Sequence, residues 1–293
     1  MSLALGLVLA LISTAALSYA AYTQHSASGT LPALSVRQPV RSLLSLFTSG
    51  RWLAGFFIGI SGLGVYILAL QFAPLSLVQA TSAGGVGLIA LLVWLGGGTL
   101  ARQERVAVAV SVGGLLLLGL SLPAGAAPAA SLTWQAPLVW VLVSVVLAGV
   151  AAVPAAGVLR PGAGLAAAAG LLYSAGDVAI KAAVDGTHPV LLFWGLLLAC
   201  HGLAFVCLQL SFQRGTALAT AGVCTLLTNL LPILAGLTVF AEAMPGGLAG
   251  AVRVAGFAGA VLGGTLLAAA SRDQPAGPAG PGRDAMTHSA GSG

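Results

Sequence analysis

Long apolar runs, each close to the length of a bilayer crossing, alternate along this chain with short polar connections. A membrane-spanning helix needs about 20 consecutive apolar residues, and nine runs approach that length. The pattern therefore predicts an all-α polytopic membrane protein with about nine transmembrane helices. The predicted spans are Leu3–Tyr22, Trp52–Phe72, Ser76–Gly97, Val106–Leu122, Ala136–Ala156, Gly162–Val184, Pro189–Leu210, Ala217–Phe240 and Leu248–Ala270.

Composition supports one membrane domain and excludes a soluble globular protein. Hydrophobic residues make up 58% of the chain and charged residues only 6%, whereas soluble domains carry about 25% charged residues. We expect a transmembrane transporter domain over residues 1–272, divided into a first half at 1–122 and a second half at 136–270. The Pro-, Gly- and Ser-rich residues 273–293 are expected to form a disordered cytoplasmic tail.

Basic residues fall almost entirely on one side of the predicted membrane. Lys181 and Arg253 lie at helix ends on the other side. By the positive-inside rule, this asymmetry predicts an external N-terminus and a cytoplasmic C-terminus in the cell membrane, with basic loops facing lipid rather than nucleic acid. The residues on the basic side are Arg37, Arg41, Arg51, Arg102, Arg105, Arg160, Arg214, Arg272 and Arg283.

An internal repeat relates two segments of the chain. Leu70–Glu104 aligns with Leu208–Glu242 at a constant offset of 138 residues, pairing Gln71 with Gln209 and Glu104 with Glu242. These four residues mark the repeat, and each Glu is expected to cap or position the helix that follows it. The offset spans five predicted helices, an odd number, so the copies would cross the membrane in opposite senses. Inverted repeats of this kind are typical of secondary transporters.

The stretch from Trp52 to Leu91 carries a family resemblance. It contains a Trp-x-x-Gly start, an Ala-x-x-Phe-Ala-Pro turn and a following Leu-Val run. This resembles the drug/metabolite transporter superfamily with its EamA-type repeat, nearest to the branch of NIPA-type magnesium transporters. The resemblance covers spans 2–4 and 7–9, and it implies a transporter fold with a central path between two halves. The branch carries an acidic residue before the turn, but Phe57–Tyr66 has none, so magnesium is kept only as an alternative substrate.

Three ionisable residues within the predicted spans are candidates for the transport path. Asp177 lies about two turns from the outer end of its span, with Lys181 four residues later on the same face. Lys181 either neutralises Asp177 as an ion pair or extends outward, and Asp177 is otherwise a proton- or substrate-linked carboxylate. His201 lies near the middle of the next span, where it either relays a proton or bonds a backbone carbonyl.

Uncharged polar residues supply the remaining candidates for a substrate or proton path. Pro232 should free the backbone carbonyl one turn earlier, at Thr228. Beside it, Asn229 either lines the path or makes hydrogen bonds between helices. Gln79 lies in the third span, whose glycines allow close packing or local unwinding. Tyr66 and Tyr173 either line the path or serve as packing residues.

Three classes of function are considered for this chain: a transporter, a membrane scaffold and an enzyme. The leading hypothesis is a secondary transporter for a small solute: a metabolite, an amine, an amino acid or a drug-like molecule. A non-transporting membrane scaffold is the alternative from another class. An enzyme is not expected, because no nucleotide-binding, hydrolase or metalloprotease motif occurs. We expect no cofactor and no metal site, and we expect the three cysteines to lie in the apolar core.

Expected partners are the solute, the lipid bilayer and a second copy of the chain. The small-residue faces Gly55-x-x-x-Gly59 and Gly259-x-x-x-Gly263 suit a homodimer. The same faces suit contacts within one chain, and the sequence does not choose between the two.

Overall fold

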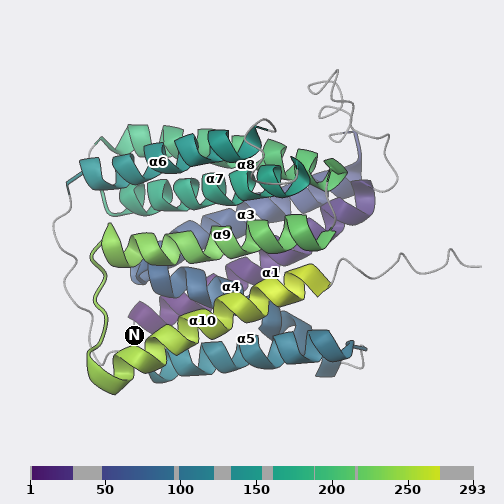
Figure 1. The fold of residues 1–293 in the computed structure, drawn as a ribbon, viewed down its shortest axis with the longest axis horizontal. Helices are drawn as coiled ribbons and strands as arrows, with labels where there is room; N and C mark the ends of the chain where they lie inside the picture. Colours follow the sequence, from purple (N-terminus) through teal and green to yellow (C-terminus); the bar gives the residue numbers. More distant parts are fainter. Residues whose placement is uncertain are drawn as a thin grey trace, which may run out of the picture.

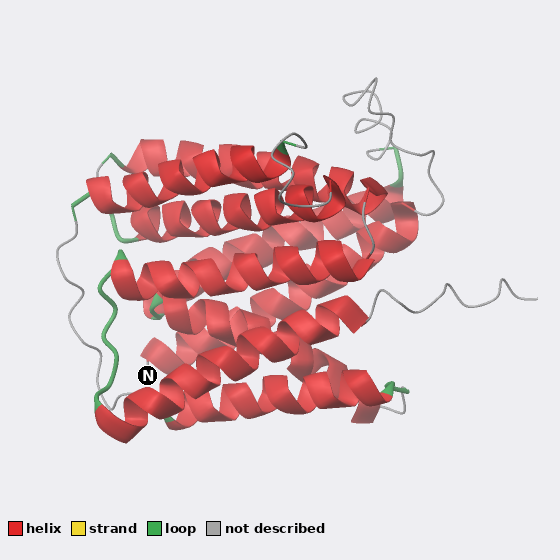
Figure 2. Ribbon diagram, viewed as in Figure 1, coloured by secondary structure: helices red, strands yellow, loops and turns green. Residues whose placement is uncertain are grey.

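The computed structural model describes residues 2–28, 48–95, 99–121, 133–153, 161–187, 189–214 and 217–270. Helices account for nearly all of these residues, and no strand occurs among them (Figure 2). Their bounds are α1 Ser2–Ser28, α3 Gly50–Phe72, α4 Leu75–Leu95, α5 Arg102–Leu120, α6 Gln135–Ala152, α7 Pro161–Val184, α8 Val190–Arg214, α9 Ala217–Thr238 and α10 Gly247–Ala270.

Seven of the described helices are long and apolar enough to cross a membrane, and Gly222–Thr238 of α9 is a shorter apolar stretch. A helix overlaps each of the nine predicted spans, which confirms the all-helical prediction in its coarse form. Several ends differ. For example, α5 begins at Arg102 rather than Val106, and α8 continues to Arg214 rather than Leu210. Hydropathy marks where apolar side chains stop, whereas helical hydrogen bonds continue into the flanking polar residues.

Local sequence explains the tight turn between α3 and α4. Ala73 ends α3 in an extended conformation (φ −140°, ψ 151°), as expected for a residue that precedes proline. Pro74 then leads into α4 at Leu75. The start of α3 is capped by Ser49, whose side chain accepts a hydrogen bond from the Trp52 backbone N–H at 3.3 Å.

The helices run roughly along the longest axis of the molecule, and successive helices alternate in direction (Figure 1). α7 is the central helix: 83% of its apolar span is buried, against 22% for the spans of α6 and α8. It packs against α6, α8 and α9. Its Gly- and Ala-rich sequence permits this, because small side chains let neighbouring backbones approach closely.

Helices that are close in sequence pack together both in residues 2–121 and in residues 135–270. α1 packs along α3 as α7 packs along α8, and α4 contacts α5 as α9 contacts α10. Between the halves, α10 packs along α5, and α4 contacts α9 and α10. α6 has its main contacts with α7.

The interface between α5 and α10 uses one of the glycine faces considered above for a homodimer. A Cβ atom added at Gly114 would overlap the backbone of Gly259 and Ala260, and one added at Gly263 would overlap Ser111. The Gly259–Gly263 face is therefore occupied within the chain, because the two helix backbones touch there. A homodimer through this face is ruled out in this arrangement.

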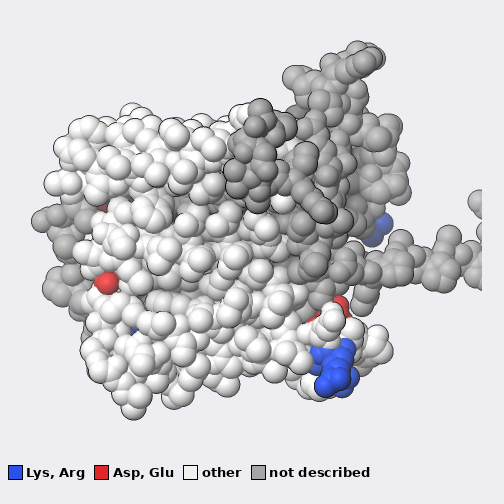
Figure 3. Space-filling view, in the orientation of Figure 1, with Lys and Arg blue, Asp and Glu red and all other residues white. Residues whose placement is uncertain are grey.

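Charged side chains lie at the two ends of the bundle, and Figure 3 shows an uncharged surface between them. Arg51, Arg102 and Arg105 lie near the start of α3 and α5, and we call this the basic end. Lys181 and Arg253 lie at the opposite end. Arg253 is buried and donates to the hydroxyl and carbonyl oxygens of Ser121 and to the carbonyl of Ala243.

Several of the sequence-based predictions fall outside the described residues. These are the segment from residue 29 to 47 with Arg37 and Arg41, then Arg160, and the tail with Arg272 and Arg283. The helical backbone is described at Gln209 and Arg214, but their side chains are outside the described set.

Candidate functional site

Asp177 lies inside the bundle on the central helix α7, and only 6% of its surface is exposed. One carboxylate oxygen, Oδ2, accepts a hydrogen bond from Gln79 Nε2 at 2.7 Å. The other, Oδ1, lies 3.7 Å from His201 Nε2. Among the described residues, no Lys or Arg nitrogen comes within 4.0 Å of this carboxylate. Within the part of the chain that the structure describes, Asp177 is therefore a buried acid without a permanent cationic partner.

Of the two alternatives for Lys181, the ion pair with Asp177 is wrong, and the outward extension agrees with the structure. Lys181 Nζ instead bonds Asp185 Oδ1 at 2.8 Å and the Leu70 carbonyl at 3.2 Å. The spacing from Lys181 to Asp185 is also four residues, so helix geometry allowed either carboxylate. The long Lys181 side chain extends toward the end of the bundle, whereas Asp177 faces neighbouring helices in the interior.

Gln79 of α4 is the centre of a hydrogen-bond network that joins four helices. Its Nε2 donates to Asp177 of α7 and to the Thr228 carbonyl of α9, the latter at 2.8 Å. Its Oε1 accepts from the Tyr66 hydroxyl of α3 at 3.2 Å. A carbonyl can only accept, so the amide nitrogen must face Thr228, and this sets the orientation of the side chain.

Pro232 explains why the Thr228 carbonyl is available to Gln79. Proline has no N–H, so it cannot bond the carbonyl four residues earlier in α9. The predicted free carbonyl at Thr228 is confirmed, since Gln79 bonds it from another helix. The neighbouring Asn229 is not part of the network. Its Nδ2 donates to the Thr225 carbonyl at 2.7 Å within α9. Of the two alternatives for Asn229, a hydrogen bond to another helix is therefore not found among the described residues.

His201 packs directly on the backbone of α7 beside Asp177. A Cβ atom at Gly176 would overlap its imidazole ring, so the close approach requires glycine there. The ring also makes an edge-to-face contact with Tyr173, with centroids 5.4 Å apart. At 3.7 Å, its Nε2 is just beyond hydrogen-bond distance from Asp177, close enough for a small movement to join the two groups.

Sequence reasoning missed two residues that shape this site. Gly176 provides the surface on which His201 lies. Ser174, one turn before Asp177, is fully buried, and its hydroxyl has no hydrogen-bond partner in the part of the chain that the structure describes. Neither carries a signal in the sequence, because Gly and Ser are common packing residues in membrane helices.

The residues that mark the repeat lie away from this network. Glu104 caps its own helix by accepting a hydrogen bond from the Ala101 backbone N–H at 2.8 Å, as predicted. Glu242 does not cap the following helix α10. It accepts from the N–H groups of Leu75 and Ser76, at 2.5 and 2.9 Å, at the start of α4. Gln71 is exposed. The prediction for Glu242 failed because the connection after α9 folds back over the first half of the chain.

Burial and hydrogen bonding act in opposite directions on Glu242, which lies in the connection between α9 and α10. Burial raises the pKa of Glu242 above its ordinary value, and this effect exceeds the lowering by its bonds to Ser76 and Leu75 and by the charge of Lys181. The carboxylate is therefore harder to ionise in the folded protein than in water.

The site brings together a carboxylate, an imidazole, an amide, two phenols and a backbone carbonyl. No three His, Cys, Asp or Glu side chains come together anywhere in the described ranges. Cys200 and Cys224 are buried, as expected for core residues, whereas Cys207 is half-buried. Comparisons with family models, with curated proteins and with solved structures gave no match.

Proposed function

We propose that this chain is an integral membrane secondary transporter, which moves a small solute by alternating access of its two halves. Asp177 is the residue that binds a proton or the cationic part of the solute. The observation that carries the proposal is the network around Gln79, which places a buried carboxylate without a fixed cation on the central helix.

The physical argument begins with the cost of a charge inside a membrane. An ionised carboxylate there is stable only with a partner charge or several hydrogen bonds. Asp177 receives one strong hydrogen bond, from Gln79, and faces an imidazole whose charge is itself variable. A proton or a cationic solute would supply the missing charge, and exchange between the two would couple transport to a proton gradient.

The position of the network suits a transporter built from two halves. Tyr66 and Gln79 belong to the first half, whereas Asp177 and Thr228 belong to the second. Any rocking of one half against the other must therefore break or rearrange the bonds of Gln79. Glu242 adds a second connection between the halves, at the end of the bundle opposite the basic end.

Two further features support the inverted-repeat arrangement implied by the resemblance to drug/metabolite transporters. The helix pairs α1–α3 and α7–α8 correspond under the repeat, as do α4–α5 and α9–α10. Arg51, Arg102 and Arg105 gather at the basic end, which supports a cytoplasmic location for that end in the cell membrane.

Proton flux in proteoliposomes tests the proposal directly. The protein would be reconstituted and challenged with a panel of amines, amino acids and magnesium, alongside Asp177→Asn. The matched control is Asp185→Asn, because Asp185 is also an acid of this region but is bound to Lys181 at the bundle end. We expect a solute-evoked flux that is lost in Asp177→Asn and retained in Asp185→Asn.

Each other outcome changes the proposal in a defined way. A flux that persists in Asp177→Asn would retain transport but remove Asp177 from the coupling step. Magnesium uptake without proton movement would favour the alternative substrate of the resembled branch. If the protein is folded and no solute of the panel evokes a flux, transport of these solutes is contradicted and the scaffold alternative is favoured.

A further inference from the structure

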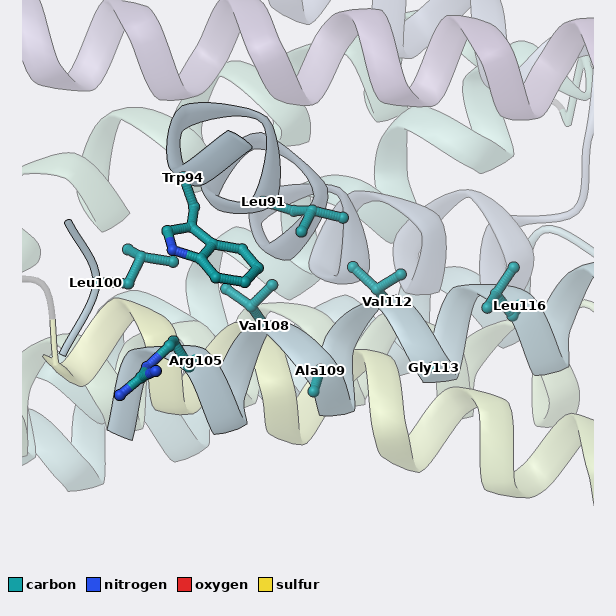
Figure 4. Close-up of a pocket in the computed structure, with 9 residues that line it drawn as sticks. All are labelled: Leu91, Trp94, Leu100, Arg105, Val108, Ala109, Val112, Gly113 and Leu116. Atoms are coloured by element: carbon teal, nitrogen blue, oxygen red, sulfur yellow. The ribbon is translucent and has the colours of Figure 1, made fainter. Parts of the chain in front are cut away.

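An apolar groove runs along the outside of the bundle between the end of α4 and α5. Its volume is about 410 Å³. Figure 4 shows its side chains arranged in a row along α5, with Arg105 near one end and Leu116 near the other. The lining residues are Leu91, Trp94, Leu100, Arg105, Val108, Ala109, Val112, Gly113 and Leu116.

The groove is separate from the network around Asp177, since none of the residues of that network lines it. Its walls are formed by aliphatic side chains and the indole of Trp94, and Arg105 is its one charged residue. At Gly113, a Cβ atom would meet no other atom within 4 Å, so the groove is open there. An apolar, elongated ligand fits these walls better than a polar solute does.

The charge at the end of the groove is not neutralised by the described residues. Arg102 and Arg105 are exposed, and neither takes part in an ion pair within the described ranges. Glu104 lies between them in sequence, but its carboxylate is buried and bonds the Ala101 N–H. Two guanidinium groups therefore remain available to an anion beside the groove, and guanidinium suits phosphate well.

The length of the groove matches one leaflet of a bilayer. From Arg105 to Leu116, α5 rises about 16 Å, close to half of the roughly 30 Å hydrocarbon core. Arginine at one end and apolar residues along the rest follow the order of a phospholipid, with its headgroup at the surface and its chain inside. Trp94 lies near the headgroup level, where Trp is favoured.

We propose that this groove binds an anionic phospholipid of the bilayer. One acyl chain lies along α5 over Gly113, and the headgroup phosphate is held by Arg105 and Arg102. The groove is separate from the proposed transport path, so the proposal of a lipid site does not depend on the proposed transport function.

Native mass spectrometry of the purified protein tests the headgroup contact. The protein would be incubated in detergent with phosphatidylglycerol or with phosphatidylcholine, and the bound lipid counted. We expect phosphatidylglycerol to be retained in preference to phosphatidylcholine. The double variant Arg102→Ala/Arg105→Ala should reduce retention of phosphatidylglycerol at least about fivefold, because the loss of even one charged hydrogen bond weakens binding by more than a factor of about five. Arg51→Ala is the control, because Arg51 is an exposed arginine of the same basic end.

A second pair of variants tests the acyl-chain contact. Gly113→Trp would fill the groove, whereas Gly119→Trp adds the same side chain to open space on α5 outside it. We expect loss of bound phosphatidylglycerol only with Gly113→Trp. Equal retention of both lipids, or retention unaffected by Gly113→Trp, would overturn the proposal. A change from dimer to monomer in Gly113→Trp, with lipid binding intact, would instead assign the groove to a second copy of the chain.

Discussion

The polar centre around Gln79 and the interface between α5 and α10 hold helices together in opposite ways. In the centre, helices are joined by side chains that reach across and make hydrogen bonds to Asp177, Tyr66 and the Thr228 carbonyl. Between α5 and α10, glycines bring the two backbones into direct contact. Both regions are buried, and the first brings a carboxylate and an imidazole together.

This difference indicates which region moves. Inside a membrane, helices are held by close packing and hydrogen bonds rather than by the hydrophobic effect. Backbone contact such as that of Gly114 with Gly259 is lost completely when helices separate. We therefore expect α5 and α10 to stay in contact and to act as the pivot about which the two halves rock. The bonds of Gln79 are few and directional, and a proton or solute at Asp177 offers replacements. We therefore expect conformational change to occur in the centre.

The largest effect is expected from Gly114→Val, which tests whether α5 and α10 are locked together. The new side chain would overlap backbone atoms of α10 that have no room to move. We expect a loss of about 3 kcal/mol in the free energy of unfolding, the upper part of the usual range for overpacking. Gly113→Val is the matched control, because it adds the same β-branched side chain at the adjacent residue, where a Cβ atom faces open space. Equal unfolding midpoints in detergent would show that the interface is loose.

A smaller effect is expected from Gln79→Leu, which removes the centre of the network but keeps a similar volume. Asp177 and the Thr228 carbonyl lose their hydrogen-bond donor, and a buried polar group without a partner costs about 1–3 kcal/mol. We expect a loss of about 2 kcal/mol in stability together with loss of solute-evoked flux. Gln71→Leu, at an exposed position of α3, should leave both unchanged. Normal flux in Gln79→Leu would show that Asp177 works without the network.

The smallest effect is expected from Glu242→Gln, at the connection that joins the two regions. The pKa of Glu242 is raised in the folded protein because of burial. Its contribution to stability is therefore complete at pH values below the ordinary pKa of Glu and declines as pH rises through the raised value. Gln does not titrate there, so the wild type should lose stability relative to Glu242→Gln as the pH rises above the ordinary pKa of Glu, about 4.3. A difference in thermal midpoint that does not vary over this pH range would contradict the assignment.

Local features of the sequence predicted the local structure well. Apolar runs of membrane-spanning length became helices, because a backbone in hydrocarbon must satisfy its own hydrogen bonds. Pro232 predicted a free carbonyl at Thr228, since the missing bond lies one turn away in the same helix. Glu104 predicted the cap at the start of α5 for a similar reason.

Tertiary structure decided which side chains meet. The spacing within α7 suggested Lys181 as the partner of Asp177, yet Asp177 bonds Gln79, 98 residues away in the chain, and faces His201. Glu242 reached across to α4 instead of capping α10. In a membrane helix, the faces toward lipid and toward protein are both apolar, so the sequence contains little periodic signal for how each helix is rotated. Close contacts between small residues set that rotation, and such contacts exist only once the helices have packed.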